Sequence, residues 1–431
     1  MKIYTKPAKA LWQDLIQRPT LEKVSLKSSI QNIFERVEKD GDTALRELTK
    51  EFDQVEIDSL IVSQAELDES ETRISSDLKK AIQIAKQNIQ KFHQGQAEAS
   101  EKVETSPGIS CWRESRGIEK VGLYIPGGSA PLFSTVLMLA IPAKIAGCKE
   151  IILCTPPSKD GKINPAILYA AKLCGVTQIF KVGGAQAIAA MTLGTETIPK
   201  VYKIFGPGNQ YVTAAKEFAT EMGVSIDMPA GPSEVLVIAD EQAVPEFCAA
   251  DLLSQAEHGP DSQVIFLTNS PSVLEETIDQ VEKQVLSLPR KEIAEKALTN
   301  SRFVLVANFD DAFDLSNQYA PEHLILALQS PEEFISKIEN VGSVFLGNFA
   351  CESAGDYASG TNHTLPTNGN ALQYSGVSVD SFVKKITFQT ISEKGIQNLG
   401  PTIEIMAEAE GLFAHKNAVS VRLNYLKQNN D

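Results

Sequence analysis

Residues 121–346 alternate short apolar runs with segments of helical length, and this alternation constrains the fold more than any other feature. The first block has expected strands at 121–125, 151–154, 178–182 and 201–205. Each is followed by a segment with the composition of a helix, and such alternation requires crossover connections, which produce a parallel sheet. The first block is therefore expected to form a doubly wound α/β unit.

A second block of the same kind begins at Val235. Its expected strands are 235–238, 264–267, 303–306, 323–328 and 341–346. Two such blocks predict two α/β domains, with a ligand bound in the crevice at the carboxyl ends of the strands. The amphipathic helices expected within residues 21–92 are predicted to pack on the second block, which would make that domain discontinuous.

The composition excludes several classes of protein. The formal net charge is −15 and no Lys/Arg block is present, which argues against nucleic acid or an anionic membrane as the main partner. Residues 1–12 lack the apolar core of a signal peptide, and no apolar run reaches membrane-spanning length. The six cysteines lack CxxC spacing, so a disulfide framework or a cysteine-rich zinc site is disfavoured. A reducing cytoplasm fits this pattern.

One expected helix carries a polar stripe at its end. Pro245 suits a first helical position and Gly259 suits the residue that closes the helix. Asp251, Gln255 and His258 fall at i, i+4 and i+7, on one face. Unpaired carbonyls at a helix C-terminus favour a cation. The stripe therefore predicts half of a metal site, although by itself it fits a histidine satisfied at a helix cap better.

The distribution of the histidines strengthens the functional interpretation. Of only five, four lie beside Gly, Pro or acidic residues at segment boundaries: His258, His323, His363 and His415. Functional residues concentrate on loops held by a rigid scaffold. The fifth, His93, lies on a charged helix and is expected at the surface.

Imidazole combined with carboxylate or amide oxygen suits zinc, manganese or cobalt. Three distant segments offer such a set: Gln255, His258, Asp356 and His415. Sequence spacing alone does not establish that these segments converge.

The pair Glu322-His323 follows Pro321 and leads into an expected strand. It offers two proton acceptors with different intrinsic pKa values, as a two-step acid/base reaction would need. A pair on the protein surface is an equally good interpretation of these two residues alone.

Three glycine turns each follow an expected strand and open a helix: Gly127-Gly128, Gly183-Gly184-Ala185-Gln186 and Gly206-Pro207-Gly208-Asn209. Bare amides at such a helix start can hold a phosphate. Neither a GxGxxG fingerprint nor a Walker A motif is present, so each motif singly could also be a tight turn. The segment 230–234 adds the hydroxyl of Ser233 near the expected interdomain cleft.

These segments together resemble the histidinol dehydrogenases, zinc-dependent enzymes at the end of histidine biosynthesis. The resemblance runs from about residue 20 to the C-terminus. It rests on the four histidine clusters and on the motifs at 122–128, 182–188, 205–209 and 227–234.

The resemblance implies an NAD-dependent, four-electron oxidation of L-histidinol to L-histidine through histidinal, with two molecules of NAD. It implies zinc ligands at Gln255, His258, Asp356 and His415, with His415 donated by the other subunit of an intertwined homodimer. The zinc is expected to orient the substrate. NAD is expected near Tyr124, Gln186 and Asn209. The implied substrate contacts are Ser233, Gln255, His258, Glu322, His323, Asp356, His363, Glu410 and His415. His323 would be the general base of both oxidations, and Glu322 would activate the water that hydrates the aldehyde.

The fold implied is two incomplete Rossmann-like domains with small terminal segments that swap between subunits. The expected boundaries are 1–20 for an N-terminal arm, 21–118 with 236–380 for the metal and catalytic domain, 119–235 for the NAD domain, and 381–431 for the swapped tail.

Two alternatives come from other classes of protein. In a metallohydrolase, a zinc-bound water would attack a carbonyl with Glu322 or His323 as the base, and turnover would need no NAD. A non-catalytic metal- or nucleotide-binding relative would have no turnover. A related amino alcohol also remains possible as the substrate, because the shape of the pocket sets that discrimination.

Overall fold

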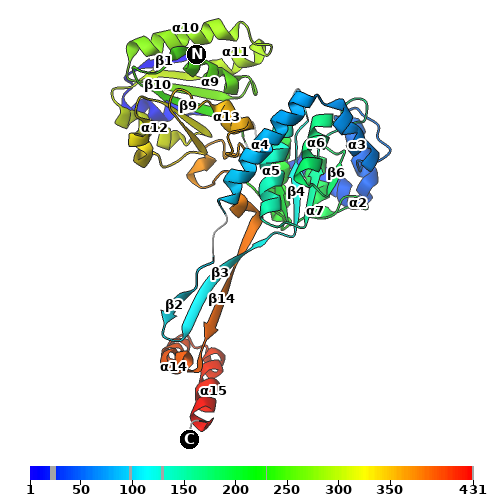
Figure 1. Cartoon of the computed structure of the whole chain (residues 1–431), viewed down its shortest axis with the longest axis vertical. Helices are drawn as coiled ribbons and strands as arrows, with labels where there is room; N and C mark the ends of the chain where they lie inside the picture. The colour runs from blue at the N-terminus through cyan, green and yellow to red at the C-terminus, as the bar shows by residue number, and fades with distance from the viewer. Residues whose placement is uncertain (20–25, 97–99, 128–130, 230, 430–431) are drawn as a thin grey trace. The chain divides into compact units, whose positions relative to one another are not determined.

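The computed structural model describes residues 1–19, 26–96, 100–127, 131–229 and 231–429. Its contacts divide the chain into two units, Met1–Gln96 with Ile118–Phe382 and Ala97–Gly117 with Val383–Asp431. The first unit contains two parallel sheets, each with helices on both faces (Figure 1). The second unit contains an antiparallel sheet and two helices.

The first block forms a five-stranded parallel sheet with the order β6-β5-β4-β7-β8. Its strands are β4 (Lys120–Tyr124), β5 (Glu150–Cys154), β6 (Gln178–Phe180), β7 (Lys203–Phe205) and β8 (Ser225–Ile226). The chain reverses its direction of progress across the sheet between β4 and β7, which makes this gap the topological switch point. The prediction of a doubly wound unit is confirmed for this block.

The second block forms a six-stranded parallel sheet with the order β1-β11-β10-β9-β12-β13. Its strands are β1 (Lys2–Thr5), β9 (Glu234–Ala239), β10 (Gln263–Thr268), β11 (Arg302–Leu305), β12 (His323–Ala327) and β13 (Ser343–Leu346). The switch point lies between β9 and β12. Strands β9 to β13 match the expected strands. Residues 1–20 were expected to form only an arm, but β1 within them pairs with β11 and extends the sheet.

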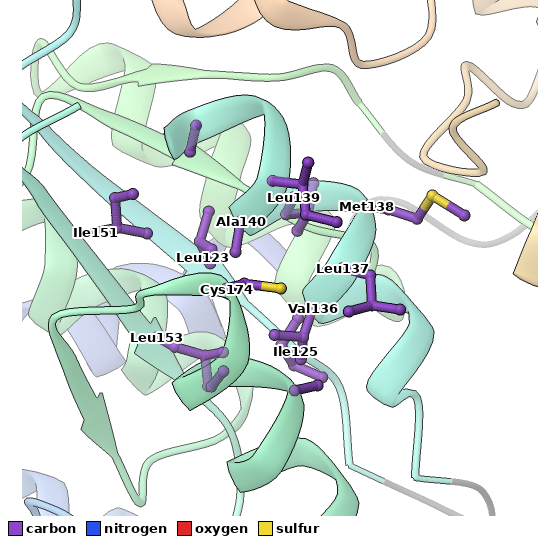
Figure 2. Packing of buried hydrophobic residues seen from close by; sticks show 14 of the residues in the cluster. Leu123, Ile125, Val136, Leu137, Met138, Leu139, Ala140, Ile151, Leu153 and Cys174 are labelled. Carbon is purple, nitrogen blue, oxygen red and sulfur yellow. The ribbon is translucent and has the colours of Figure 1, made fainter. Parts of the chain in front are cut away.

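Helices cover both faces of the five-stranded sheet. One core contains α4 (Ser76–Gln94), α5 (Phe133–Ile145) and α6 (Pro165–Cys174), and the opposite core contains α2 (Leu26–Phe52), α7 (Gly184–Leu193) and α8 (Gln210–Glu221). Figure 2 shows the first core, where Leu123 and Leu153 of the strands lie near Val136 and Cys174 of α5 and α6. Burial on both faces explains why these strands are continuous apolar runs.

The early helices lie elsewhere than predicted. Residues 21–118 were expected to join the domain of residues 236–380, but α2 and α4 contribute Ile30, Leu45 and Ile89 to the cores of the five-stranded sheet. Helix α3 (Gln64–Arg73) packs on α6 of the same sheet. The apolar periodicity of these helices predicts that one face is buried, but it does not specify which sheet buries it. Residues 20–25 lie outside the described part of the chain.

The six-stranded sheet has the same three-layer arrangement. Helices α9 (Pro245–Ala256), α10 (Pro271–Val285) and α11 (Lys291–Thr299) cover one face, and α1 (Trp12–Leu15) with α12 (Phe309–Tyr319) covers the other. Helix α13 (Glu352–Tyr357) contacts α9. Short 3-10 helices complete the unit at Lys9–Leu11, Pro331–Lys337, Asn370–Leu372 and Val379–Phe382.

The second unit is an antiparallel sheet of order β14-β3-β2, followed by a helical pair. Its elements are β2 (Val103–Ser106), β3 (Ile109–Gly117), β14 (Val383–Ile391), α14 (Glu393–Ala409) and α15 (Phe413–Asn429). The helical tail was predicted, but β14 was not. Ile405, Met406, Phe413 and Tyr425 of the two helices are more than half exposed. In the described residues, none of the helices combines the length and the apolar character needed to cross a bilayer.

A buried ion pair fixes the glycine turn after β7. Lys216 and Asp227 form the pair, and each side chain is 1% exposed. Lys216 Nζ donates to the carbonyl oxygen of Gly206 at 2.9 Å, and Asp227 Oδ2 accepts from the Gly206 N–H at 2.8 Å. Gly206 has φ +135°, and a Cβ there would lie 2.1 Å from the carbonyl oxygen of Tyr124, so glycine is required.

We expect Asp227→Asn to lower the free energy of unfolding by about 3–5 kcal/mol, because it leaves the buried charge of Lys216 without an opposite charge. Urea denaturation followed by circular dichroism measures this change. The matched control is Glu221→Gln, which removes the exposed pair between Lys27 and Glu221 and should change stability by less than about 0.5 kcal/mol. Equal effects of the two variants would contradict the role given to the buried pair.

Candidate functional site

Most of the candidate metal and catalytic residues in the first unit gather at the amino ends of β9 and β12. Ser233 and Glu322 directly precede these two strands, and His323 begins β12 opposite Val235. Helix α9 follows β9 and returns to the same edge, which brings Gln255 near its end to this side of the sheet. The candidate residues of this sheet therefore lie at the amino ends of the strands and not at the carboxyl ends where a ligand crevice was expected, because they precede the strands and the returning helix ends beside them.

His323 is buried and held by one ring nitrogen. Its Nδ1 lies 3.1 Å from the carbonyl oxygen of Glu234. Nε2 of Gln255 lies 3.2 Å from the same nitrogen. Because a carbonyl oxygen can only accept, we assign the proton to Nδ1 from the shorter contact, which leaves the lone pair of a neutral ring on Nε2. Nε2 has no hydrogen-bond partner and lies 3.7 Å from Oδ1 of Asp356. The ring is therefore oriented with its basic nitrogen toward the acidic cluster.

Three carboxylates surround His323: Glu322, Glu352 and Asp356. Burial raises the pKa of Glu322 to about 8, and burial also raises the pKa of Glu352. Burial alone would lower the pKa of His323, but Glu322, Asp356 and Glu352 together raise it to about 10. Burial alone would raise the pKa of Asp356, but the nearby imidazoles of His323, His363 and His258 outweigh it and lower the pKa. The cluster has more acidic than basic groups, and a bound cation would balance this charge.

Gln255 presents an oxygen without a partner. Gln255 is 1% exposed, and its Nε2 donates a hydrogen bond to Oε1 of Glu352. The other carboxylate oxygen of Glu352, Oε2, accepts from the hydroxyl of Ser254 at 3.1 Å. Oε1 of Gln255 and Oδ1 of Asp356 are buried without a hydrogen-bond partner. A buried oxygen left unpaired costs about 1–3 kcal/mol, and a metal ion would satisfy both atoms.

His258 adds an imidazole to this group. Its Nδ1 lies 3.3 Å from Oγ of Ser233, and the charge of Asp356 acts on its ring. Desolvation by the surrounding protein lowers the pKa of His258, although part of the residue is open to solvent. The neutral imidazole, which is the form that binds metals, is therefore favoured. Amide oxygen, imidazole nitrogen and carboxylate oxygen, without a thiolate, form a donor set that fits zinc.

A second arrangement of ligands is also present. In the described part of the chain, His323, Glu352 and Asp356 place ligand atoms within 4.8 Å of one another. This triad shares only Asp356 with the predicted ligand set. Sequence analysis missed Glu352, although its spacing of four residues from Asp356 places both on one face of α13.

His363 joins the same region. Its Nδ1 lies 2.8 Å from the carbonyl oxygen of Asp356, and its Nε2 lies 3.1 Å from Oγ1 of Thr135 on α5. His93 differs from the prediction, because it is fully buried and its Nε2 lies 3.4 Å from Nδ2 of Asn362. The charged face of α4 suggested a surface position, but His93 lies on the opposite, buried face with Ile82 and Ile89.

The structure does not bring all predicted residues together. Glu410 and His415 belong to the second unit, at the turn between α14 and α15 and at the start of α15, and both are exposed.

The residues predicted to contact NAD lie at the carboxyl edge of the five-stranded sheet. Tyr124 ends β4, and its phenol oxygen accepts from the N–H of Gly184 at 3.0 Å. Gln186 is 1% exposed, and its Nε2 has no partner. Asn209 caps α8, with Oδ1 accepting from the N–H groups of Tyr211 and Val212. Tyr124 and Asn209 lie on opposite sides of the switch point, where α/β sheets commonly bind ligands.

Two of the three glycine turns open helices as predicted, with Gly184 beginning α7 and Asn209 preceding α8. Packing also explains two of these glycines, because a Cβ at Gly127 or Gly183 would lie 2.1 or 2.4 Å from Pro156. Gly128, the second glycine of the first turn, and Ala230 lie outside the described residues.

Comparison with known proteins identifies the family. A family model described as histidinol dehydrogenase matches residues 16–423. The histidinol dehydrogenase of Bacteroides fragilis (strain YCH46) is 58% identical over 99% of this chain and 100% of its own length. That of Vibrio parahaemolyticus is 50% identical over 97% of this chain and 99% of its own length. The crystal structure of histidinol dehydrogenase from Elizabethkingia anophelis superimposes with a TM-score of 0.98 at 59% identity, over 99% of both chains.

These matches confirm the resemblance inferred from the motifs, and the structural match confirms the predicted α/β fold. The chain is an oxidoreductase and belongs to the histidinol dehydrogenase family.

Proposed function

We propose that this protein oxidises L-histidinol to L-histidine through L-histidinal, with two molecules of NAD as hydride acceptors, in the final steps of histidine biosynthesis. Family membership supports histidinol oxidation. The observation that carries the finer proposal is the buried cluster in which His323 lies beside the unpartnered oxygens of Gln255 and Asp356. The six cysteines are free thiols, which supports the cytoplasm as the compartment.

Zinc would be held by Gln255, His258, Asp356 and the partner subunit's His415. When bound, it would orient the imidazole and amine of the substrate and balance the charge of the acidic cluster. The amide, carboxylate and imidazole donors support this assignment, and the same donor set would also accept manganese or cobalt. The remaining proposed substrate contacts are Ser233, Glu322, His323, His363 and Glu410.

His323 is proposed as the general base of both oxidations. Because the carboxylates raise the pKa of His323, the ring must first lose its Nε2 proton, and a cation that balances the acidic cluster would favour this neutral form. The neutral Nε2 then takes the hydroxyl proton of histidinol while the carbinol carbon loses hydride to the first NAD, which gives the aldehyde. His323 then releases this proton to solvent, and Glu322 activates the water that adds to the aldehyde. In the second oxidation, His323 takes the hydroxyl proton of the hydrate while hydride passes to the second NAD. The contact between Nδ1 of His323 and the carbonyl oxygen of Glu234 supports these roles, because it keeps Nε2 directed at the cluster.

NAD is proposed to bind beside Tyr124, Gln186 and Asn209 in the domain of residues 119–235. The unpartnered amide of Gln186 supports a ligand here. Because Oδ1 of Asn209 already caps α8, its Nδ2 is the group free to contact the dinucleotide. Without a GxGxxG turn, the pyrophosphate would be held by amides and a few side chains.

The reaction predicts two NADH per histidinol. We expect absorbance at 340 nm to report this stoichiometry with zinc-loaded protein, to disappear after chelation and to return when zinc is added. One NADH per histidinol would instead mean that the reaction stops at the aldehyde. No NADH from intact, zinc-loaded protein would contradict the proposal, and zinc-dependent hydrolysis without NAD would favour the metallohydrolase.

A site shared between subunits predicts complementation. His415→Ala and His258→Ala should each lose bound zinc and activity as pure dimers, and Asn417→Ala on the exposed side of α15 should lose neither. Mixed dimers carry one site without either substitution, so we expect about half of the wild-type activity per mixed dimer. The apolar side chains exposed on α14 and α15 support a dimer formed through this unit. Mixed dimers of confirmed composition without activity would contradict the shared site.

A further inference from the structure

We infer that Arg18, in the N-terminal segment of the chain, is a positioning residue that fixes Glu322 and His323 through Glu234. This inference rests on the proposed function, because it assumes that Glu322 and His323 do the acid/base chemistry. Arg18 was not among the candidate residues of the sequence, since it lies far from every motif.

The side chain of Arg18 forms a two-pronged ion pair with Glu234. Nε donates to Oε1 at 2.5 Å and Nη2 donates to Oε2 at 2.9 Å. The two side chains are 18% and 2% exposed, and the guanidinium lies 4.0 Å from the centre of the Tyr319 ring. The N–H of Asn368 also donates to Oε1 at 2.9 Å. Such a planar fork fixes both the distance and the orientation of the carboxylate.

The backbone of Glu234 contacts both proposed catalytic residues. Its N–H donates to Oε2 of Glu322 at 3.0 Å, and its carbonyl oxygen accepts from Nδ1 of His323 at 3.1 Å. A shift of this residue would therefore change the position of the carboxylate and the orientation of the imidazole together. By fixing the position of Glu234, Arg18 therefore also fixes the positions of Glu322 and His323.

Arg18 also contacts the turn that leads into β12. Nη2 donates to the carbonyl oxygen of Tyr319, the last residue of α12, at 2.6 Å. Ala320 follows with φ +51°, a conformation that is costly for a residue with a Cβ, and Pro321 precedes Glu322. One guanidinium therefore joins the start of β9 to the turn before β12, the two segments that place Glu322 and His323.

Attachment of the N-terminal segment does not require this ion pair. Strand β1 pairs with β11 along its whole length, and Trp12 and Leu15 lie in the core beneath α12. Lys9 adds exposed ion pairs with Asp311 and Asp314. These contacts hold the segment in place, so the main effect expected of the Arg18–Glu234 ion pair is on the positions of Glu322 and His323. Lys9 lies on the same segment and provides a matched control.

The experiment compares Arg18→Met, Arg18→Lys and Lys9→Met. We expect Arg18→Met to lower kcat by about 100-fold, the effect of a misplaced catalytic group, with KM and bound zinc close to wild type. Arg18→Lys keeps the positive charge but cannot form both hydrogen bonds to the Glu234 carboxylate, so its loss of kcat should be smaller than that of Arg18→Met. Lys9→Met should keep kcat. If Arg18→Met does not fold, the double variant Arg18→Met with Glu234→Gln removes the unpaired charge, and it should also lose kcat. Folded Arg18 variants with normal kcat would overturn the inference.

A second readout does not depend on turnover. Because the chain has five histidines, ¹⁵N-histidine spectra of the full-length protein can be assigned by the signal missing in His323→Gln. We expect the Nδ1–H signal of His323 to shift in Arg18→Met and to stay unchanged in Lys9→Met. An unchanged signal in Arg18→Met would overturn the inference. Because this signal does not depend on turnover, the positioning role of Arg18 can be tested even if the wild-type enzyme is inactive on histidinol.

Discussion

Three carboxylates buried around one imidazole impose the constraint on which the rest of this site depends. Glu322, Glu352 and Asp356 could not share one low-dielectric region with His323 unless hydrogen bonds and opposite charge compensated them. The structure supplies part of this compensation through the N–H of Glu234, the hydroxyl of Ser254 and the amide of Gln255. The protein provides no hydrogen bond to Oε1 of Gln255 or to Oδ1 of Asp356. A cation bound to these two oxygens would balance the remaining negative charge.

The scaffold explains how segments far apart in sequence reach one place. Parallel strands β9 and β12 are neighbours across the switch point, so residues that precede them in the chain meet at the amino edge of the sheet. Helix α9 returns to that edge, and α13 adds two carboxylates on one face. The N-terminal segment reaches the same edge through Arg18. The residues proposed to contact NAD lie instead at the carboxyl edge of the five-stranded sheet, so the two sheets carry their candidate residues at opposite edges.

Local patterns predicted both parallel sheets, because apolar runs and helix signals depend on neighbouring residues. Tertiary relations were not predictable in the same way: α2 and α4 have apolar faces that would suit either sheet. Because α4 carries many charged residues, His93 was expected at the surface, although it is buried. Strand β14 was not predicted because its lysines interrupt the apolar pattern. The histidine clusters pointed to the site, and the spacing of Glu352 from Asp356 offered a signal for Glu352. The hydrogen bonds of Arg18 to Glu234 follow from the tertiary fold, and no sequence spacing specifies them.

In the proposed site, the metal ligands and the general base are different residues of one cluster. Diffraction from zinc-loaded crystals at the zinc absorption edge tests it most directly. The account predicts an anomalous peak within about 2.0–2.2 Å of Gln255, His258, Asp356 and the partner subunit's His415, with Nε2 of His323 outside ligand distance. A peak held by His323, Glu352 and Asp356 would contradict it and would make His323 a metal ligand instead of the base.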